Sequence, residues 1–266
     1  MTLRITTLDN GVRVVTDPMP HLQTLSIGVW IDAGSRYETT ENNGIAHLLE
    51  HMLFKGTARR SARDIAEEIE AVGGILNAFT SRDHTTFYAR VMKEDTALAV
   101  DLLADLIQNS VFDQHELERE REVILQEIGQ AQDTPDDIVF DMLQEQAFPN
   151  QALGRSILGT DATMRSVSRD QLVDFQRTHY RGDAIVVSAA GHVDHDALVA
   201  LADKAFGALP SGRANTFEPG RYEGGVIRAD RPLEQLHLTL GFPSISYSDP
   251  DFYALNVFST MLGGGM

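Results

Sequence analysis

The residues in this sequence best suited to do chemistry are the two histidines and the glutamate of the segment HLLEH, 47–51. On a helix each residue advances by about 100°, so His47, Glu50 and His51 would project from one face. Two imidazoles one turn apart can bind one divalent metal ion, and a carboxylate between them can accept a proton from water. This is the inverted zinc motif H-x-x-E-H, although such a short pattern also recurs by chance in unrelated chains.

Composition limits the classes of site and partner. The 266 residues are 42% hydrophobic and 23% charged, which is typical of one large globular domain or two smaller ones. Because the chain has no cysteine, disulfides and thiol nucleophiles are excluded, and a metal ion would be bound by histidine and carboxylate. The formal net charge of −17 argues against nucleic acid as a partner. It permits basic substrates, but solubility alone also accounts for it.

The N-terminal stretch MTLRITTLDNGVRVV has neither the charge pattern nor the apolar core of a signal peptide or transit peptide. No apolar run approaches the roughly 20 residues of a membrane span. We therefore expect a soluble protein without membrane contact, in the cytoplasm of a bacterial-type cell.

Hydrophobic periodicity indicates that strands and helices come in groups and do not alternate strictly. Six segments have strand patterns, the first two flanking the hairpin signal Asn10-Gly11: 3–8, 11–16, 23–31, 75–80, 85–91 and 184–190. Asn43 is the expected N-cap of the HLLEH helix, and Ser61 with Asp64 forms a capping-box pattern. Further helices are expected at 61–73, 94–109, 113–131, 135–147, 168–178 and 194–206. The fold class is therefore α+β, a mostly antiparallel sheet packed against helices.

A second group of acidic residues lies in the segment FDQHELEREREVILQEI, 112–128. Glu120 and Glu127 are seven residues apart and therefore nearly in register on one face of a helix, beside apolar Val123 and Ile124. Taken alone, Glu127 would be read as an exposed helix glutamate.

Three segments together carry a family resemblance: HLLEHMLFKGT, then GGILNAFTSRDHTTFYARV at 73–91, then REREVILQEI at 119–128. In this order and spacing the chain resembles the pitrilysin-type (inverzincin) family of zinc metallopeptidases. The branch it resembles most contains the β subunit of mitochondrial processing peptidase and its bacterial homologues. LGRSILGT at 153–160 and AIVVSAAGHVDHDAL at 184–198 extend the resemblance along the whole chain.

The resemblance implies a zinc-dependent endopeptidase that hydrolyses short or unfolded peptides. It implies one Zn²⁺ per chain bound by His47, His51 and Glu127, with Glu50 as general base and Glu120 as a supporting acidic residue of the catalytic site. If Glu120 lies behind a histidine ligand, it would accept the second ring N–H and fix the orientation of that ring. The alternative function is a non-catalytic scaffold or regulatory subunit of a processing-peptidase-like complex, since the family also contains members without the ligands.

The segment GGILNAFTS suits an edge strand onto which an extended peptide adds. The pattern alone leaves an inner strand equally open, whereas the resemblance favours the edge and implies that Asn77, Ala78 and Phe79 bind substrate. His84 is a rival metal ligand by residue type only, and we expect it in a structural or pocket-wall role.

A gapless shift aligns HLLEHMLFKG with NVFSTMLGGG at 256–265 and places Asn256, Ser259 and Thr260 opposite the three motif residues. Identity is sparse and chance alignment stays open, but a repeat is physically sensible. We expect three regions: a metal-bearing peptidase domain at 1–210, a linker at 211–226, and the start of a truncated, ligand-free second domain of the same fold at 227–266. The expected partners are a peptide substrate and a missing C-terminal half or homologous subunit, in a homo- or heterodimer.

Overall fold

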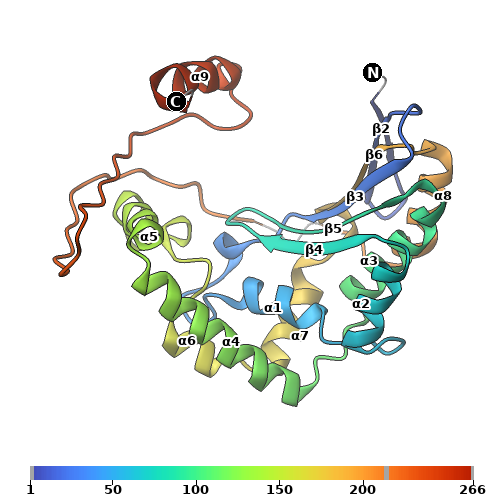
Figure 1. Ribbon diagram of the computed structural model, residues 1–266, viewed down its shortest axis with the longest axis horizontal. Helices are drawn as coiled ribbons and strands as arrows, with labels where there is room; N and C mark the ends of the chain where they lie inside the picture. The colour runs from blue at the N-terminus through green and yellow to red at the C-terminus, as the bar shows by residue number, and fades with distance from the viewer. Residues whose placement is uncertain (1–2, 213–215, 265–266) are drawn as a thin grey trace.

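The computed structural model describes residues 3–212 and 216–264, and its centre is one six-stranded sheet with helices beneath it (Figure 1). The strand order is β1-β2-β6-β3-β5-β4. The strands are β1 Arg4–Thr7, β2 Arg13–Pro18, β3 Thr24–Ile31, β4 Ile75–Thr80, β5 Thr85–Met92 and β6 Ile185–Gly191. Only the β2–β6 pair is parallel among these strands. The predicted fold class, α+β with a mostly antiparallel sheet, is confirmed.

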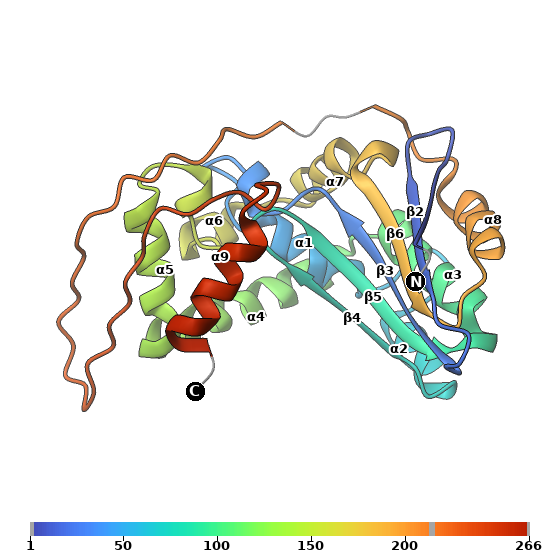
Figure 2. The ribbon, with the colours of Figure 1, turned by 90° about the horizontal axis from the view of Figure 1, so that it is seen from above.

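One face of the sheet belongs to the core and the other is open. On β3, Leu25 and Ile27 are buried towards the helices, whereas Trp30 lies on the opposite face and is exposed. Figure 2 looks onto this open face, on which Ile75, Phe79 and other large apolar side chains are also exposed.

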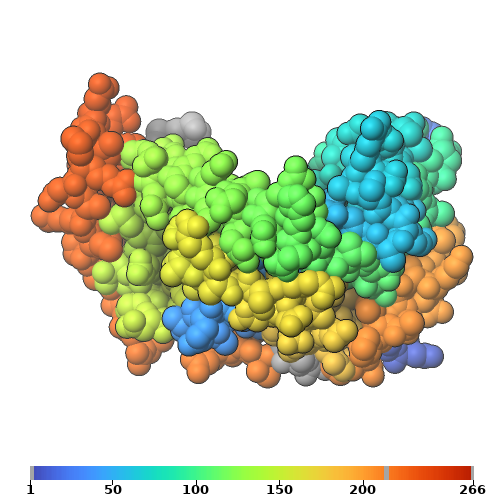
Figure 3. Space-filling view, turned by 90° about the horizontal axis from the view of Figure 1, so that it is seen from below, coloured from blue at the N-terminus to red at the C-terminus, as the bar shows by residue number. Residues whose placement is uncertain are grey.

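Most of the helices cover the other face of the sheet, and α2, α4, α6 and α7 form much of the surface seen in Figure 3, whereas α9 lies apart from this layer (Figure 1). The α-helices are α1 Ile45–Leu53, α2 Ala62–Ala71, α3 Thr96–Asn109, α4 Gln114–Asp133, α5 Pro135–Ala147, α6 Asp161–Ser166, α7 Arg169–His179, α8 His195–Phe206 and α9 Phe252–Ser259. Leu48, Leu49 and Met52 of α1 are fully buried in the core. Their burial fixes the orientation of the other face of α1, which carries the polar residues of HLLEH. Periodicity missed α6 because its six residues are too few to show a helical repeat.

The cap of α1 differs from the sequence prediction. Asn43 is not its N-cap; the N-cap is Gly44, at φ +94°, and the backbone N–H groups of Gly44 and Ala46 donate to the carboxylate of Glu38 at 2.8 and 2.9 Å. Asn43 instead donates its side-chain amide to Glu38 at 2.8 Å. Burial raises the pKa of Glu38 to about 7, against these hydrogen bonds, which lower it. The predicted capping box of Ser61 and Asp64 is present.

The described residues beyond 215 form no strand and run as an exposed segment to α9 (Figure 1). Phe217 packs edge-on against Tyr37 and lies under the guanidinium of Arg36, 3.7 Å from the ring centroid. The region aligned with the HLLEH helix does form a helix, since α9 extends to Ser259. The division into two domains stays a prediction. Among the described residues, no helix is both long and apolar enough to cross a membrane.

Candidate metal centre

His47 and His51 of α1 and Glu127 of α4 meet at one point. One side-chain nitrogen or oxygen from each of the three residues lies within 4.8 Å of the other two. The Nε2 atoms of His47 and His51 are each 3.9 Å from Oε2 of Glu127. Helices α1 and α4 contact each other, and each contributes buried side chains, such as Leu49 and Ile124, to the hydrophobic core. This packing brings the carboxylate to the histidine pair. In the described part of the chain, no other cluster of three or more His, Cys, Asp or Glu has this geometry.

The environment of the histidines suits a metal ion. Burial, and then the neighbouring His51, lowers the pKa of His47 to about 4, so its imidazole is neutral at pH 7. Its Nε2, which lies 3.9 Å from Glu127, is the nitrogen that faces the cluster, whereas its Nδ1 is buried without a hydrogen-bond partner among the described residues. Two imidazole nitrogens and one carboxylate oxygen form a donor set that zinc accepts, with a fourth position left for water or substrate. These residues therefore fit a zinc ion.

Glu120 lies behind His51 and is almost fully buried. Its Oε2 is 3.0 Å from Nδ1 of His51, and its Oε1 is 2.8 Å from Nζ of Lys55. The two carboxylate oxygens are thus both engaged, and one of them fixes the tautomer and the plane of the His51 ring. Lys55 was not identified from the sequence; its only signal was a cation four residues after His51, just beyond the end of α1.

Glu50 projects from the same face of α1 and does not join the three-residue cluster. Its Oε2 accepts a hydrogen bond from Oγ1 of Thr80 at 2.5 Å. Burial raises the pKa of the Glu50 carboxyl, while the Thr80 hydrogen bond and His51 oppose the rise. No group in the described part of the chain donates a hydrogen bond to Oε1, so this oxygen of Glu50 stays available to a proton. Thr80 was also missed by sequence reasoning, although strand alternation places it on the helix side of β4 with Ala78.

The strand that carries Asn77, Ala78 and Phe79 is at the edge of the described sheet, because β4 pairs only with β5. Asn77 and Phe79 point to the open face, where Phe79 contacts Trp30 and His84 with ring centroids 6.0 and 5.8 Å apart. His84 is therefore part of an aromatic group and lies outside the metal cluster. Ala78 is half-buried and points to the core side.

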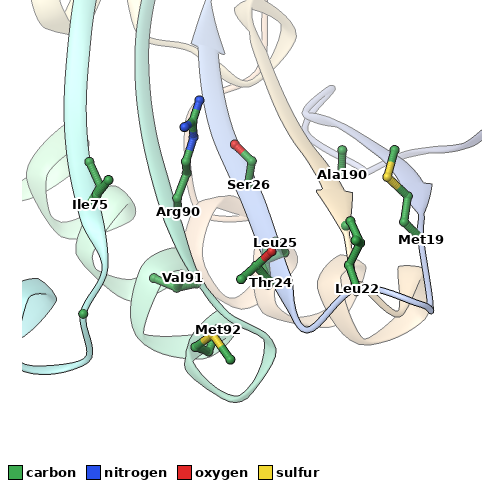
Figure 4. A pocket seen from close by; sticks show the side chains of 12 residues that line it. Met19, Leu22, Thr24, Leu25, Ser26, Ile75, Arg90, Val91, Met92 and Ala190 are labelled. Atoms are coloured by element: carbon green, nitrogen blue, oxygen red, sulfur yellow. The ribbon is translucent and has the colours of Figure 1, made fainter.

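Two shallow hollows on the described surface lie on the open face of the sheet, each with a volume of about 430 Å³. Figure 4 shows the first, whose lining combines the apolar side chains of Met19, Leu22, Ile75 and Met92 with the polar side chains of Thr24, Ser26 and Arg90. Neither hollow contains a residue of the metal cluster or Glu50. The reactive groups therefore lie at the contact of α1, α4 and β4.

Family models and curated relatives match the chain over most of its length. A family model described as "Insulinase (Peptidase family M16)" matches residues 13–161, and one described as "Peptidase M16 inactive domain" matches residues 166–266. The chain is 44% identical over 268 residues to the probable mitochondrial-processing peptidase subunit beta of Arabidopsis thaliana, covering 98% of this chain and 50% of that protein. It is 41% identical over 261 residues to the uncharacterized zinc protease YmxG of Bacillus subtilis, covering 98% and 64%.

A solved structure of a peptidase M16 inactive domain from Pseudomonas fluorescens shares the fold, with a TM-score of 0.85 and 20% identity. It covers 100% of this chain and 65% of that chain. This chain therefore spans about half to two thirds of the length of these relatives. The second family model begins at residue 166, before β6, although β6 completes the same sheet as β2 and β3.

Proposed function

Because the chain belongs to the insulinase family of peptidases (M16), we propose that it carries the metal site of a zinc-dependent endopeptidase acting on short or unfolded peptides. The observation that carries the proposal is the meeting of His47, His51 and Glu127, with the carboxylate of Glu50 on the same face of α1. Such a set combines a three-ligand site with a separate proton acceptor, as metallopeptidase chemistry requires.

The residues divide the work as follows. A bound zinc ion supplies a Lewis acid that lowers the pKa of a water molecule. His47, His51 and Glu127 would hold the ion, and Glu120 orients His51 through Nδ1. Glu50 accepts the proton of the attacking water at its free Oε1 and returns a proton to the leaving amine.

The edge strand β4 offers a place for the peptide beside these groups. An extended peptide can add to a free strand edge through backbone hydrogen bonds, which give affinity with little dependence on sequence. We propose that Asn77, Ala78 and Phe79 contact the substrate there. Because β4 ends at Thr80, whose hydroxyl contacts Glu50, a peptide on this edge would lie next to the proton acceptor.

A second half or subunit is part of the proposal. The Arabidopsis relative is named as a beta subunit, and this chain covers half of its length. We propose that the partner is either a further domain of the same protein or a homologous subunit that encloses the site. The alternative, a non-catalytic scaffold, is disfavoured because His47, Glu50, His51 and Glu127 are all present.

The test compares Glu50→Gln with wild type in the complete protein, using an unstructured fluorogenic peptide and elemental analysis. We expect the variant to keep its zinc and to lose cleavage, because glutamine cannot accept the proton. Glu122→Gln, an exposed position of α4, is the control and should cleave normally. Normal cleavage by Glu50→Gln, or a wild-type protein that binds no zinc, would overturn the proposal.

A further inference from the structure

The edge strand and the proton acceptor are joined by one side chain, Thr80. Its Oγ1 donates to Oε2 of Glu50 at 2.5 Å, and the two residues are 30 positions apart in the sequence. Within residues 3–212 and 216–264, Oε1 of Glu50 is left without a hydrogen-bond donor. The hydroxyl of Thr80 therefore fixes which carboxylate oxygen is presented to the reaction.

The backbone of Thr80 faces the free edge of the sheet. In an antiparallel strand, the N–H and C=O groups of alternate residues point to opposite edges. The N–H of Ser81 donates to the carbonyl of His84 within the β4–β5 hairpin. The backbone N–H and C=O groups of the odd-numbered residues of β4 therefore point to β5. The N–H of Ala78 is bonded to its neighbour Asn77 at 2.8 Å and not to β5. Thr80, in step with Ala78, therefore presents its backbone outward and its side chain to α1.

The end of β4 is held in place by other segments. The N–H of Ser35 donates to the carbonyl of Ser81 at 3.1 Å, and the N–H of Arg36 donates to the carbonyl of Arg82 at 3.0 Å. The guanidinium of Arg82 donates to the carbonyl of Leu153 at 3.2 Å. The turn after Thr80 is therefore anchored independently of the Thr80 hydroxyl, and loss of that hydroxyl should leave the strand in place.

We infer that Thr80 is a positioning residue that couples a peptide strand bound on the edge of β4 to the orientation of the general base. The inference rests on the proposed function. A peptide strand that pairs with the outward backbone of Thr80 restricts that residue, and the hydroxyl transmits the restriction to the Glu50 carboxylate. A base held in this way is aligned when substrate is bound, and misalignment of about 1 Å can cost a hundredfold in rate.

The experiment measures kcat, KM and zinc content of Thr80→Val and Thr80→Ser in the complete protein. Valine keeps the β-branched shape and replaces the hydroxyl with a methyl group. We expect Thr80→Val to lose at least about tenfold in kcat, with KM within about twofold of wild type and zinc retained. Serine restores the hydroxyl and should bring kcat back to within about threefold.

Thr86→Val is the matched control, because the hydroxyl of Thr86 on the adjacent strand is buried without a hydrogen-bond partner. It should leave kcat unchanged. The inference is overturned if Thr80→Val keeps full kcat, if Thr80→Ser is as slow as Thr80→Val, or if Thr80→Val loses its zinc. Failure of the proposed function looks different, since wild type would then lack zinc or Glu50→Gln would still cleave.

Discussion

Replacing Glu120 with glutamine should weaken zinc binding without removing any of the three ligands. In the structure, the Glu120 carboxylate contacts Nδ1 of His51 at 3.0 Å and pairs with Lys55 at 2.8 Å, and its side chain is only 8% exposed. Glutamine can still accept the hydrogen bond from His51, but it carries no charge. The variant therefore changes the charge behind the His51 ligand more than it changes the shape of the side chain there.

The expected loss follows from two contributions. A hydrogen bond to a charged group contributes about 1.5–3 kcal/mol and one between neutral groups about 0.5–1.5 kcal/mol, so the exchange costs about 1–1.5 kcal/mol. Removing a negative charge near a divalent cation adds to this cost. Together they match the 10–100-fold loss of metal affinity that is typical for residues behind a metal ligand, or about 1.4–2.7 kcal/mol.

The assay is competition for zinc between the protein and a chelator of known affinity, with circular dichroism to verify folding. Glu122→Gln, on the exposed side of the same helix, should bind zinc as wild type does. If folded Glu120→Gln binds zinc as tightly as wild type and Glu122→Gln, then Glu120 does not support His51 and the reasoning is wrong.

Two further predictions concern the free energy of unfolding, measured by urea titration in the presence of a metal chelator. Asp105 is buried and bonded to two arginines, so Asp105→Asn should cost about 3–5 kcal/mol, against less than about 1 kcal/mol for half-exposed Asp101→Asn. Burial raises the pKa of Asp105, but its hydrogen bonds outweigh burial and hold the pKa below its ordinary value. The stabilisation by Asp105 is therefore present above about pH 4 and is lost as the pH falls through the folded-state pKa. Equal effects of the two variants, or no loss of stability in acid, would contradict this. Gly44 and Gly73 both have positive φ, but a Cβ at Gly44 meets a carbonyl oxygen at 2.7 Å and one at Gly73 meets nothing within 4 Å. Gly44→Ala should therefore cost about 2–5 kcal/mol and Gly73→Ala about 1–2 kcal/mol, and the reverse order would refute the steric argument.

The strands and most helices could be predicted because their signals are local. Alternation marks β3, and the turn signal Asn10-Gly11 marks the first hairpin, where Gly11 has φ +94°. The HLLEH spacing likewise places its three polar residues on one face of a helix. Each of these features depends on residues within a few positions of one another.

The contacts that complete the site could not be predicted in this way because they join distant segments. Thr80 meets Glu50, and Lys55 meets Glu120, only after the sheet and α4 have packed against α1. The cap of α1 failed as a prediction for the same reason, since a carboxylate from Glu38 outside the helix replaces the nearby Asn43 side chain. Packing decides such pairings, and sequence spacing alone does not report it.

The central claim is that His47, His51 and Glu127 bind one zinc ion, and metal analysis tests it most directly. We would measure zinc per chain in the complete protein and in Glu127→Gln, both purified without chelator and then supplied with zinc. The account predicts about one zinc ion per chain in wild type and a large loss in the variant. Absence of zinc from the wild-type protein, or full retention by Glu127→Gln, would contradict it.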